Sequence, residues 1–365
     1  MPLSKIQLGN TGRRNLVING GMLVAQRGTT STAVGADGVS GYHNMDRWRI
    51  AIGATSAGRV TMAQTAVTDL ASFSKSMKIS CTTADTSVAA GEILIFTQRF
   101  EGQNLQSLKA SSTSTQAFTV SFYAKSNASR AIATEIIFVN GTNKSASKLH
   151  TIGTSWQRYT MTIPAASSTQ IDDDNSHEMS LNFWLHAGST YTSGTMSGTL
   201  GAITNANRAA GIGSIFASTS NTLEIAGVQI EKGSVATDFE HRSFAEELTL
   251  CQRYLHILGD AAATSTIGMG SNFGTGGAYF AGLHPVEMRA IPTLTFSAAS
   301  HFRLHTISGG GVTGITSAGG GSENSNSTYL INFGKSGAFT SGGGNLCFNN
   351  ASTNPYGTVK FDAEL

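Results

Sequence analysis

Alternation of apolar and polar side chains is the feature of this sequence that most restricts its fold. From about residue 42 to residue 240, apolar residues repeatedly recur at every second position. Successive side chains of a β-strand point to opposite faces, so this pattern places one face on a core and the other outward. A helix would instead need apolar residues spaced by three and four. The region is therefore predicted to form an antiparallel β-sandwich or barrel.

Three segments show the alternation most clearly, and they are FTVSFYAK at 118–125, WQRYTMTIP at 156–164 and MSLNFWLHA at 179–187. In the first segment, Phe118 and Phe122 are predicted to face the core. The second ends at Pro164, which cannot donate a hydrogen bond to a sheet ladder. A further segment, ATEIIFV, is followed by Asn140-Gly141, a pair typical of a tight hairpin.

The composition agrees with short strands joined by tight turns and excludes several functions. Of 365 residues, 42 are glycine, only 5 are proline, and 13% are charged. A formal net charge of +2 offers no broad basic surface for nucleic acid. No apolar run reaches the roughly 20 residues that span a bilayer. The length favours two domains.

The cysteines and the N-terminus indicate a protein assembled inside a cell. Cys81, Cys251 and Cys347 are widely spaced and form no C-x-x-C pair, so they are predicted to be buried thiols. The opening MPLSKIQLGN lacks the apolar core of a signal peptide.

Residues 1–30 are predicted to be an attachment arm or a first strand. They contain basic residues and no acidic residue. The basic residues are Lys5, Arg13, Arg14 and Arg27. A basic arm would dock on an acidic partner. The alternative is a first strand from Asn15 to Ala25 along the edge of the sandwich. Residues 31–242 are assigned to the main β domain.

A connecting helix is predicted over residues 243–258. Ser243 and Glu246 have the spacing of a capping box, which satisfies free amides at a helix start. Leu248, Cys251 and Leu255 then recur at helical spacing, and Gly259 would end the helix.

A second β domain is predicted over residues 259–365, as a small sandwich or barrel. Charged residues are sparse there, and glycine clusters separate strand-like runs such as YLINF and TVKFDAEL. His301, Arg303 and His305 alternate along one strand face. Histidines so placed could hold a metal on the axis of a trimer, whereas the simpler interpretation is a solvated face.

A search for catalytic motifs yields no nucleophile elbow, zinc motif or phosphate loop. A polysaccharide-cleaving site would need two carboxylates about 5–10 Å apart. Glu92, Glu101 and Glu135 lie in or near predicted strands and are the candidates. Solvated or edge-strand carboxylates are the preferred interpretation, and the chain is predicted not to be an enzyme.

An acidic loop, DDDNSHE, places carboxylates where they could bind calcium. Asp172, Asp174 and Glu178 would supply oxygen ligands, together with Asp173, but the loop lacks the glycine and full spacing of an EF-hand. A solvated loop is the alternative, so no cofactor is predicted beyond this candidate calcium site.

A carbohydrate site is predicted on the outward faces of two strands. Trp184 shares its face with Asn182 and His186, while Tyr123 and Lys125 project from another strand. Exposed aromatic rings stack on sugar rings, and nearby amides read hydroxyls. The alternative is that Trp184 is buried under a loop or a subunit contact.

The segment NTLEIAGVQIEKGSVATDFEHRSFAEELTLCQRYL at 221–255 resembles one that recurs in tail-fibre and other virion proteins of bacteriophages, particularly those infecting marine and other aquatic bacteria. NLVINGGMLVAQRG, MDRWRI, FTVSFYAKS and SWQRYTMTIP upstream resemble the same family in the same order, as do PVEMRAIPTLTF and FDAEL downstream. The order of segments in the first domain is similar to that of carbohydrate-binding-module jelly rolls. The resemblance implies a jelly-roll β-sandwich that could include structural calcium, and a place in the virion.

These observations predict a non-catalytic structural protein of a phage particle. The preferred assignment is a homotrimeric tail-fibre subunit that contacts other tail proteins and a host-surface glycan or protein, after assembly in the host cytoplasm. A capsid decoration or head-fibre protein is the first alternative. A polysaccharide-degrading tailspike is the second.

Overall fold

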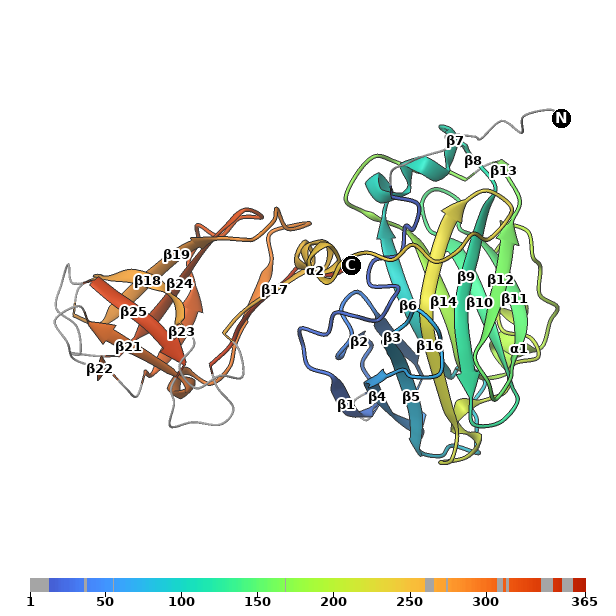
Figure 1. Cartoon of the computed structure of the whole chain (residues 1–365), viewed down its shortest axis with the longest axis horizontal. Helices are drawn as coiled ribbons and strands as arrows, with labels where there is room; N and C mark the ends of the chain where they lie inside the picture. Colours follow the sequence, from blue (N-terminus) through green and yellow to red (C-terminus); the bar gives the residue numbers. More distant parts are fainter. Residues whose placement is uncertain are drawn as a thin grey trace. The chain divides into compact units, whose positions relative to one another are not determined.

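The computed structural model describes residues 13–35, 38–54, 56–167, 169–259, 266–273, 275–306, 311–312, 315–335, 344–349 and 357–365. The chain divides between Glu247 and Leu248 into two compact units, called here the first and the second domain. Both are built from antiparallel strands, so the protein is all-β, as predicted (Figure 1). No helix in the described residues is both long and apolar enough to cross a membrane.

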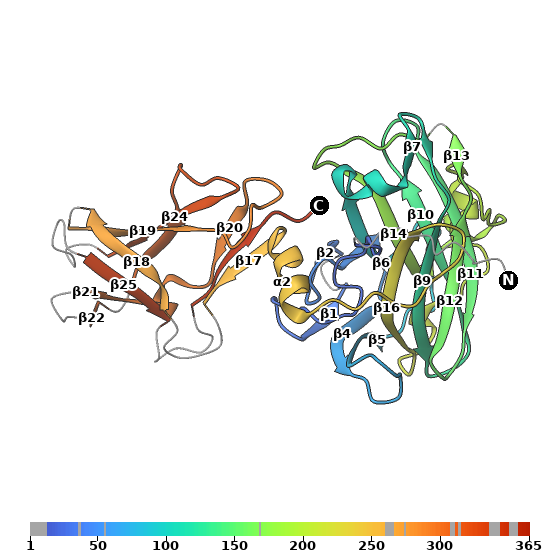
Figure 2. The ribbon, with the colours of Figure 1, turned by 45° about the horizontal axis from the view of Figure 1, so that its top comes forward.

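The first domain is a jelly-roll β-sandwich of two facing sheets (Figure 2). The six-stranded sheet has the order β1 (Thr30–Val34), β4 (Arg59–Ala66), β5 (Lys75–Thr83), β16 (Thr222–Lys232), β9 (Phe118–Ser126) and β12 (Gln157–Ile163). The seven-stranded sheet has the order β15 (Gly201–Ala202), β11 (Lys144–Ile152), β10 (Arg130–Phe138), β14 (His177–Ala187), β6 (Ile93–Glu101), β3 (Arg49–Gly53) and β2 (Gly41–Tyr42).

Short elements complete this domain at the edges and ends of the two sheets. A small sheet contains β13 (Ala166–Ser167), β8 (Ser114–Thr115) and β7 (Lys109–Ser111). The short helices are η1 (Gly102–Leu108), α1 (Ser189–Thr192), η2 (Asn205–Asn207) and η3 (Ile215–Ala217). Because β16 pairs with both β5 and β9, the sheet joins segments about 100 or more residues apart in the chain.

The core lies between the two sheets and follows the alternation in the sequence. On β9, Phe118, Val120, Phe122 and Ala124 are all fully buried in it, which confirms the predicted inward face. The predicted hairpin after β10 also forms, and Gly141 takes a φ of +68° in it. Burial of about 25 cal/mol per Å² of apolar surface is the main force that holds the sheets together.

The segment from Asn15 to Ala25 is not the edge strand that was one of the two predictions. Its residues form turns and irregular backbone, with Asn19 and Met22 at φ of +57°. Val17 and Met22 are nevertheless fully buried in the core. The side chain of Asn15 bridges to β16, donating to the Val228 carbonyl and accepting from the Ile230 amide. Two backbone bonds, from the Leu16 amide to the Ile230 carbonyl and from the Val228 amide to the Gly20 carbonyl, add to this side-chain bridge without forming a strand ladder.

The connecting helix is shorter than predicted. It is α2, spanning Phe244–Gln252, and the chain from Leu255 to Leu258 forms strand β17. The capping box is confirmed, since the Ser243 amide donates to Glu246 Oε2 at 2.8 Å and the Glu246 amide to Ser243 Oγ at 3.3 Å. The helix ends early because β17 pairs with β26, a contact with a distant segment that helical spacing cannot reveal.

The second domain is a small sandwich of a three-stranded and a seven-stranded sheet. The smaller sheet has the order β17, β26 (Val359–Asp362) and β20 (Thr293–Phe296). The larger has the order β22 (Gly311–Val312), β21 (Phe302–Thr306), β25 (Gly344–Asn349), β18 (Thr266–Phe273), β19 (Gly277–Leu283), β24 (Thr328–Gly334) and β23 (Ser317–Gly320). The short helix η4 (Ala299–His301) precedes β21. Phe280, Phe333 and Phe361 lie in their shared core.

Candidate functional site

A band of aromatic side chains covers part of the outer face of the six-stranded sheet. Its centre is Tyr123 on β9, which faces outward because its neighbours Phe122 and Ala124 face the core. Tyr123 is paired with Arg158 on β12 and with Ala226 on β16. The guanidinium carbon of Arg158 lies 5.9 Å from the centre of the Tyr123 ring, within range of a cation–π interaction.

The band continues from Tyr123 through rings that come from two distant loops. Phe73, in the loop between β4 and β5, lies 5.2 Å from Tyr123 between ring centres. Phe239 and His241, in the segment after β16, each lie 5.1 Å from Phe73. Phe73 and Phe239 are partly buried and His241 is exposed. Together with Trp156, described below, these rings make up the aromatic band: Phe73, Tyr123, Trp156, Phe239 and His241.

Gly227 makes room for this arrangement. The register of β16 against β9 shifts between Ala226 and Gln229, and Gly227 has a φ of +58°. A Cβ atom at this position would lie 2.5 Å from Cζ of Phe73 and 3.0 Å from Cδ2 of Tyr123. Only glycine lets both rings approach the backbone here.

At the other end of the band, Trp156 is held by a charged network. Its indole Nε1 donates to Asp69 Oδ1 at 2.9 Å, and Lys125 Nζ donates to Asp69 Oδ2 at 2.7 Å. Lys125 Nζ also lies 5.0 Å from the centre of the Trp156 ring. The hydrogen bonds from Lys125 and then Trp156 hold the pKa of Asp69 below its ordinary value.

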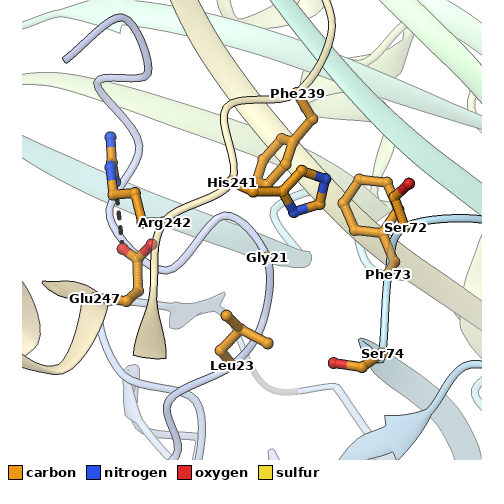
Figure 3. A pocket seen from close by; sticks show the side chains of 9 residues that line it. All are labelled: Gly21, Leu23, Ser72, Phe73, Ser74, Phe239, His241, Arg242 and Glu247. Atoms are coloured by element: carbon orange, nitrogen blue, oxygen red, sulfur yellow. Dashed lines mark hydrogen bonds and ion pairs between the residues drawn. The ribbon is translucent and has the colours of Figure 1, made fainter. Parts of the chain in front are cut away.

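A pocket opens beside the rings of Phe73, Phe239 and His241 (Figure 3). Its volume is about 120 Å³. The three rings gather on one side, and the ion pair between Arg242 Nη1 and Glu247 Oε1, 3.3 Å long, lies on another (Figure 3). The remaining lining residues are Gly21, Leu23, Ser72 and Ser74. The pocket therefore combines apolar rings with polar and charged groups.

Buried carboxylate bonding fixes the loop that carries Phe239. Glu231 on β16 accepts hydrogen bonds from the amide and the hydroxyl of Thr237, at 2.8 and 2.6 Å. The carbonyl of Thr237 accepts a bond from Arg158. These contacts place the loop against the sheet, so the band does not depend on a freely moving segment.

The predicted carbohydrate residues do not come together. Tyr123 and Lys125 lie on the six-stranded sheet, whereas Trp184, Asn182 and His186 lie on β14 of the other sheet. Trp184 and His186 are fully buried and Asn182 is nearly so. The prediction of an exposed Trp184 is wrong, and the alternative is correct, because residues 188–214 cover it: Tyr191 lies 5.2 Å from its ring.

Four of the band's five rings were not predicted as site residues from the sequence alone, and only Tyr123 was. Phe73 and Phe239 lie in loops, where alternation gives no indication of direction. His241 is close to Phe239 in the chain and shares its loop. Trp156 was predicted only to begin a strand, and β12 in fact begins one residue later. The one available signal was the concentration of aromatic residues just after β16.

The three glutamates considered for catalysis are buried, not solvated. Glu135 accepts from Arg208 Nε at 2.7 Å and from Nη2 at 3.0 Å. Glu92 lies 3.1 Å from His186 Nε2, and Glu101 accepts a bond from Gln103 Nε2. Each of the three carboxylates therefore has different partners.

The carboxylates of the candidate calcium loop are bonded to neighbouring backbone and side-chain groups. Both oxygens of Glu178 accept from the Asp172 amide, at 3.0 and 2.9 Å. Asn140 donates to both Asp172 and Glu178, and Asp174 accepts from the Ser176 amide. Within the described residues, no group of three or more acidic, histidine or cysteine side chains could hold a metal.

The basic residues of the predicted arm are only partly described. Lys5 lies outside the described residues. Arg13 and Arg14 are exposed, and the Arg14 amide donates to Glu240 Oε1 at 3.0 Å. Arg27 lies over the Tyr42 ring, 5.4 Å from its centre.

In the second domain, β21 has the predicted alternation, with Phe302 and Leu304 in the core and Arg303 and His305 partly exposed. His301 precedes the strand, in η4. Cys81 and Cys251 are buried free thiols, as predicted, and the side chain of Cys347 lies outside the described part.

No protein-family model matches the sequence, and no curated protein matches it. Among solved structures, the chain is similar to one described as "CBM4 structure and function", with 14% identity and a TM-score of 0.31, over 60% of this chain and 100% of that one. It is similar to the family 11 carbohydrate-binding module of a cellulosomal cellulase of Clostridium thermocellum, with 14% identity and a TM-score of 0.28, over 54% of this chain and 91% of that one.

A third similar structure is the enzymatically active domain of tailspike protein 4 of bacteriophage CBA120. The identity is 14% and the TM-score 0.30, over 60% of this chain but only 21% of the tailspike chain. At these identities and scores, the likenesses carry no conclusion about ligand or activity.

Proposed function

We propose that the first domain binds carbohydrate through the aromatic band. The observation that carries the proposal is a cluster of rings on this sheet face. Phe73, Phe239 and His241 lie 4.9 to 5.1 Å from one another between ring centres, and Tyr123 lies 5.2 Å from Phe73. Flat aromatic faces stack on the apolar faces of pyranose rings. The partly exposed rings of Tyr123, Phe73 and Phe239 would offer such a surface to a sugar.

Polar groups along the band would select among sugars. Asp69, Lys125 and Arg158 lie beside Trp156 and Tyr123, and each can bond to a sugar hydroxyl. Because Asp69 already orients Trp156 and Lys125, these groups are held in place before a ligand arrives.

We further propose that the chain is a non-catalytic subunit of a phage appendage that attaches to a host-surface glycan. Support comes from the resemblance of residues 221–255 to virion proteins, and the Phe239 loop of the band belongs to that segment. Several copies on one particle would strengthen weak individual sites through avidity. A homotrimer is the expected assembly.

The binding test is a glycan array probed with the full chain and with Trp156→Ala and Tyr123→Ala. Each substitution is expected to weaken glycan binding at least tenfold. The reason is that loss of the stacking contact, together with the contacts beside it, removes about 1.5 kcal/mol or more of binding free energy. Leu149→Ala is the matched control, since Leu149 is 41% exposed on the other sheet. Unchanged binding by both aromatic variants, with unchanged melting temperatures, overturns the assignment of this site.

The location and the absence of catalysis have their own tests. Antibody labelling of virions, viewed by electron microscopy, should mark tails. Labelled capsids with bare tails would instead identify a decoration or head-fibre protein. Release of reducing sugar from host polysaccharide would establish a tailspike enzyme. Light scattering of the purified chain tests the trimer.

A further inference from the structure

The outer face of the seven-stranded sheet carries two arginines that form no ion pair in the described part of the chain, at the end away from Trp184. Arg49 on β3 is paired with Thr97 on β6, and Arg99 on β6 is paired with Ser180 on β14. Residues two apart on a strand share a face, so both arginines project from the same outer face as Thr97 and Ser180. Diagonal neighbours on adjacent strands lie about 7–8 Å apart between Cα atoms.

Neither guanidinium has a hydrogen bond or an ion pair with a side chain or backbone group in the described part of the chain. Other arginines of this domain behave differently: Arg208 is bonded to Glu135, and Arg242 to Glu240 and Glu247. Both Arg49 and Arg99 are partly buried. An arginine with little solvent and no anion is costly, and two together are more so.

His177 lies at the same end of the sheet, paired with Glu101, whose buried carboxylate accepts a bond from Gln103 Nε2. Nε2 of His177 lies 2.8 Å from Oγ of Ser180, the residue paired with Arg99. Burial is the main cause that lowers the pKa of His177 to about 4, and Arg99, Arg49 and Arg47 lower it further. No carboxylate is among the described groups that act on it. At neutral pH the ring is therefore uncharged and can still offer a hydrogen bond.

From this placement we infer that Arg49 and Arg99, with Ser180 and His177, form a binding site for an oxyanion: a carboxylate, sulfate or phosphate group. Guanidinium groups bind such groups through two parallel hydrogen bonds, and an oxyanion between them would balance both charges. The ligand is either a free inorganic anion or the acidic group of a sugar. This site lies on the opposite sheet from the aromatic band and does not depend on it.

The test is calorimetric titration of the full chain with sodium sulfate, sodium phosphate and sodium glucuronate, each at constant ionic strength. Saturable binding of at least one is expected. Arg49→Gln combined with Arg99→Gln should weaken it at least tenfold. Lys75→Gln combined with Lys148→Gln removes the same charge elsewhere on the domain and should change the affinity less than threefold. Tyr123→Ala should leave it unchanged.

The outcomes separate the sources of the anion. Tighter binding of glucuronate than of the inorganic anions supports an acidic sugar, whereas the reverse order supports a free inorganic anion. Equal loss of affinity in the arginine and lysine variants would mean general charge attraction and would overturn the site. Absence of saturable binding for all three anions by the unmodified chain would overturn it as well.

Discussion

The indole Nε1 of Trp184 donates a hydrogen bond of 2.9 Å to Oε2 of Glu135, and both side chains are fully buried. Glu135 also binds Arg208, whose guanidinium carbon lies 4.8 Å from the centre of the Trp184 ring. The outward face of β14 is therefore buried as well, in a second interior that contains both apolar and charged side chains. The cover is provided by residues 188–214, which include Tyr191 and Arg208.

Replacing Glu135 should destabilise the first domain strongly. Glu135→Gln leaves Arg208 without its carboxylate, and breaking a buried ion pair in this way costs about 2–4 kcal/mol. Chemical denaturation followed by tryptophan fluorescence would measure the change. Glu224→Gln is the control, because the Glu224–Lys78 pair is 3.8 Å long with Lys78 exposed, and an exposed pair contributes about 0–1 kcal/mol. Equal losses in both variants would contradict the prediction.

Gly227→Ala should disturb the aromatic band through its Cβ atom. The atom would collide with Phe73, and the expected cost is about 2 kcal/mol or more, because overpacking adds to the strain of positive φ. Glycan binding should weaken with it. Gly141→Ala controls for the backbone, since Gly141 has a similar φ of +68° but its Cβ would meet only Gln170 Oε1, at 3.8 Å. Equal effects of the two substitutions on both stability and binding would exclude the steric explanation.

Acid should loosen the second domain through a buried histidine pair. Nδ1 of His256 lies 3.1 Å from Nδ1 of His284, so one ring donates while the other accepts, which requires at least one neutral ring. Burial, and then His284, lowers the pKa of His256 to about 4, and burial lowers the pKa of His284. The unfolded chain takes up these protons near pH 6.5, before the folded chain does. The free energy of unfolding therefore has its full value above that pH, and it falls by about 1–3 kcal/mol as the pH drops toward 4.

Hydrogen exchange of the β17 and β26 amides between pH 7 and pH 4.5, corrected for intrinsic rates, would measure this loss. In the His256→Gln variant, the protection of these amides should depend less on pH. His241→Gln, an exposed substitution in the first domain, should leave it as it is. Protection that is independent of pH in the unmodified chain would contradict the prediction.

Removal of calcium should not change the stability of the first domain. The Glu178 oxygens already accept two hydrogen bonds from the Asp172 amide, and Asn140 bridges the two carboxylates. EDTA, or added calcium chloride at equal ionic strength, is expected to shift the melting temperature by less than about 1 °C, because a ligand stabilises only when it binds the folded state. A clear fall with EDTA that calcium restores would revive the calcium site.

The sequence by itself determined which side chains of each strand share a face. Phe118, Phe122 and Leu181 point into the core because alternation along a strand is a local property of the chain. The capping box could also be predicted from the sequence, because Ser243 and Glu246 lie within one helical turn of each other. The length of α2 could not be predicted in this way, because β17 forms only through its pairing with β26.

Only the tertiary structure decided what covers each outward face. The outward faces of β9 and β14 alternate alike in sequence, yet Tyr123 is partly exposed while Trp184 is fully buried. The difference arises from residues 188–214, which fold over β14, and from two loops that add Phe73 and Phe239 to β9. Alternation along a strand predicts the direction of each side chain. It gives no information about segments 50 or 100 residues away in the chain, because their positions depend on contacts that form only when the whole domain packs.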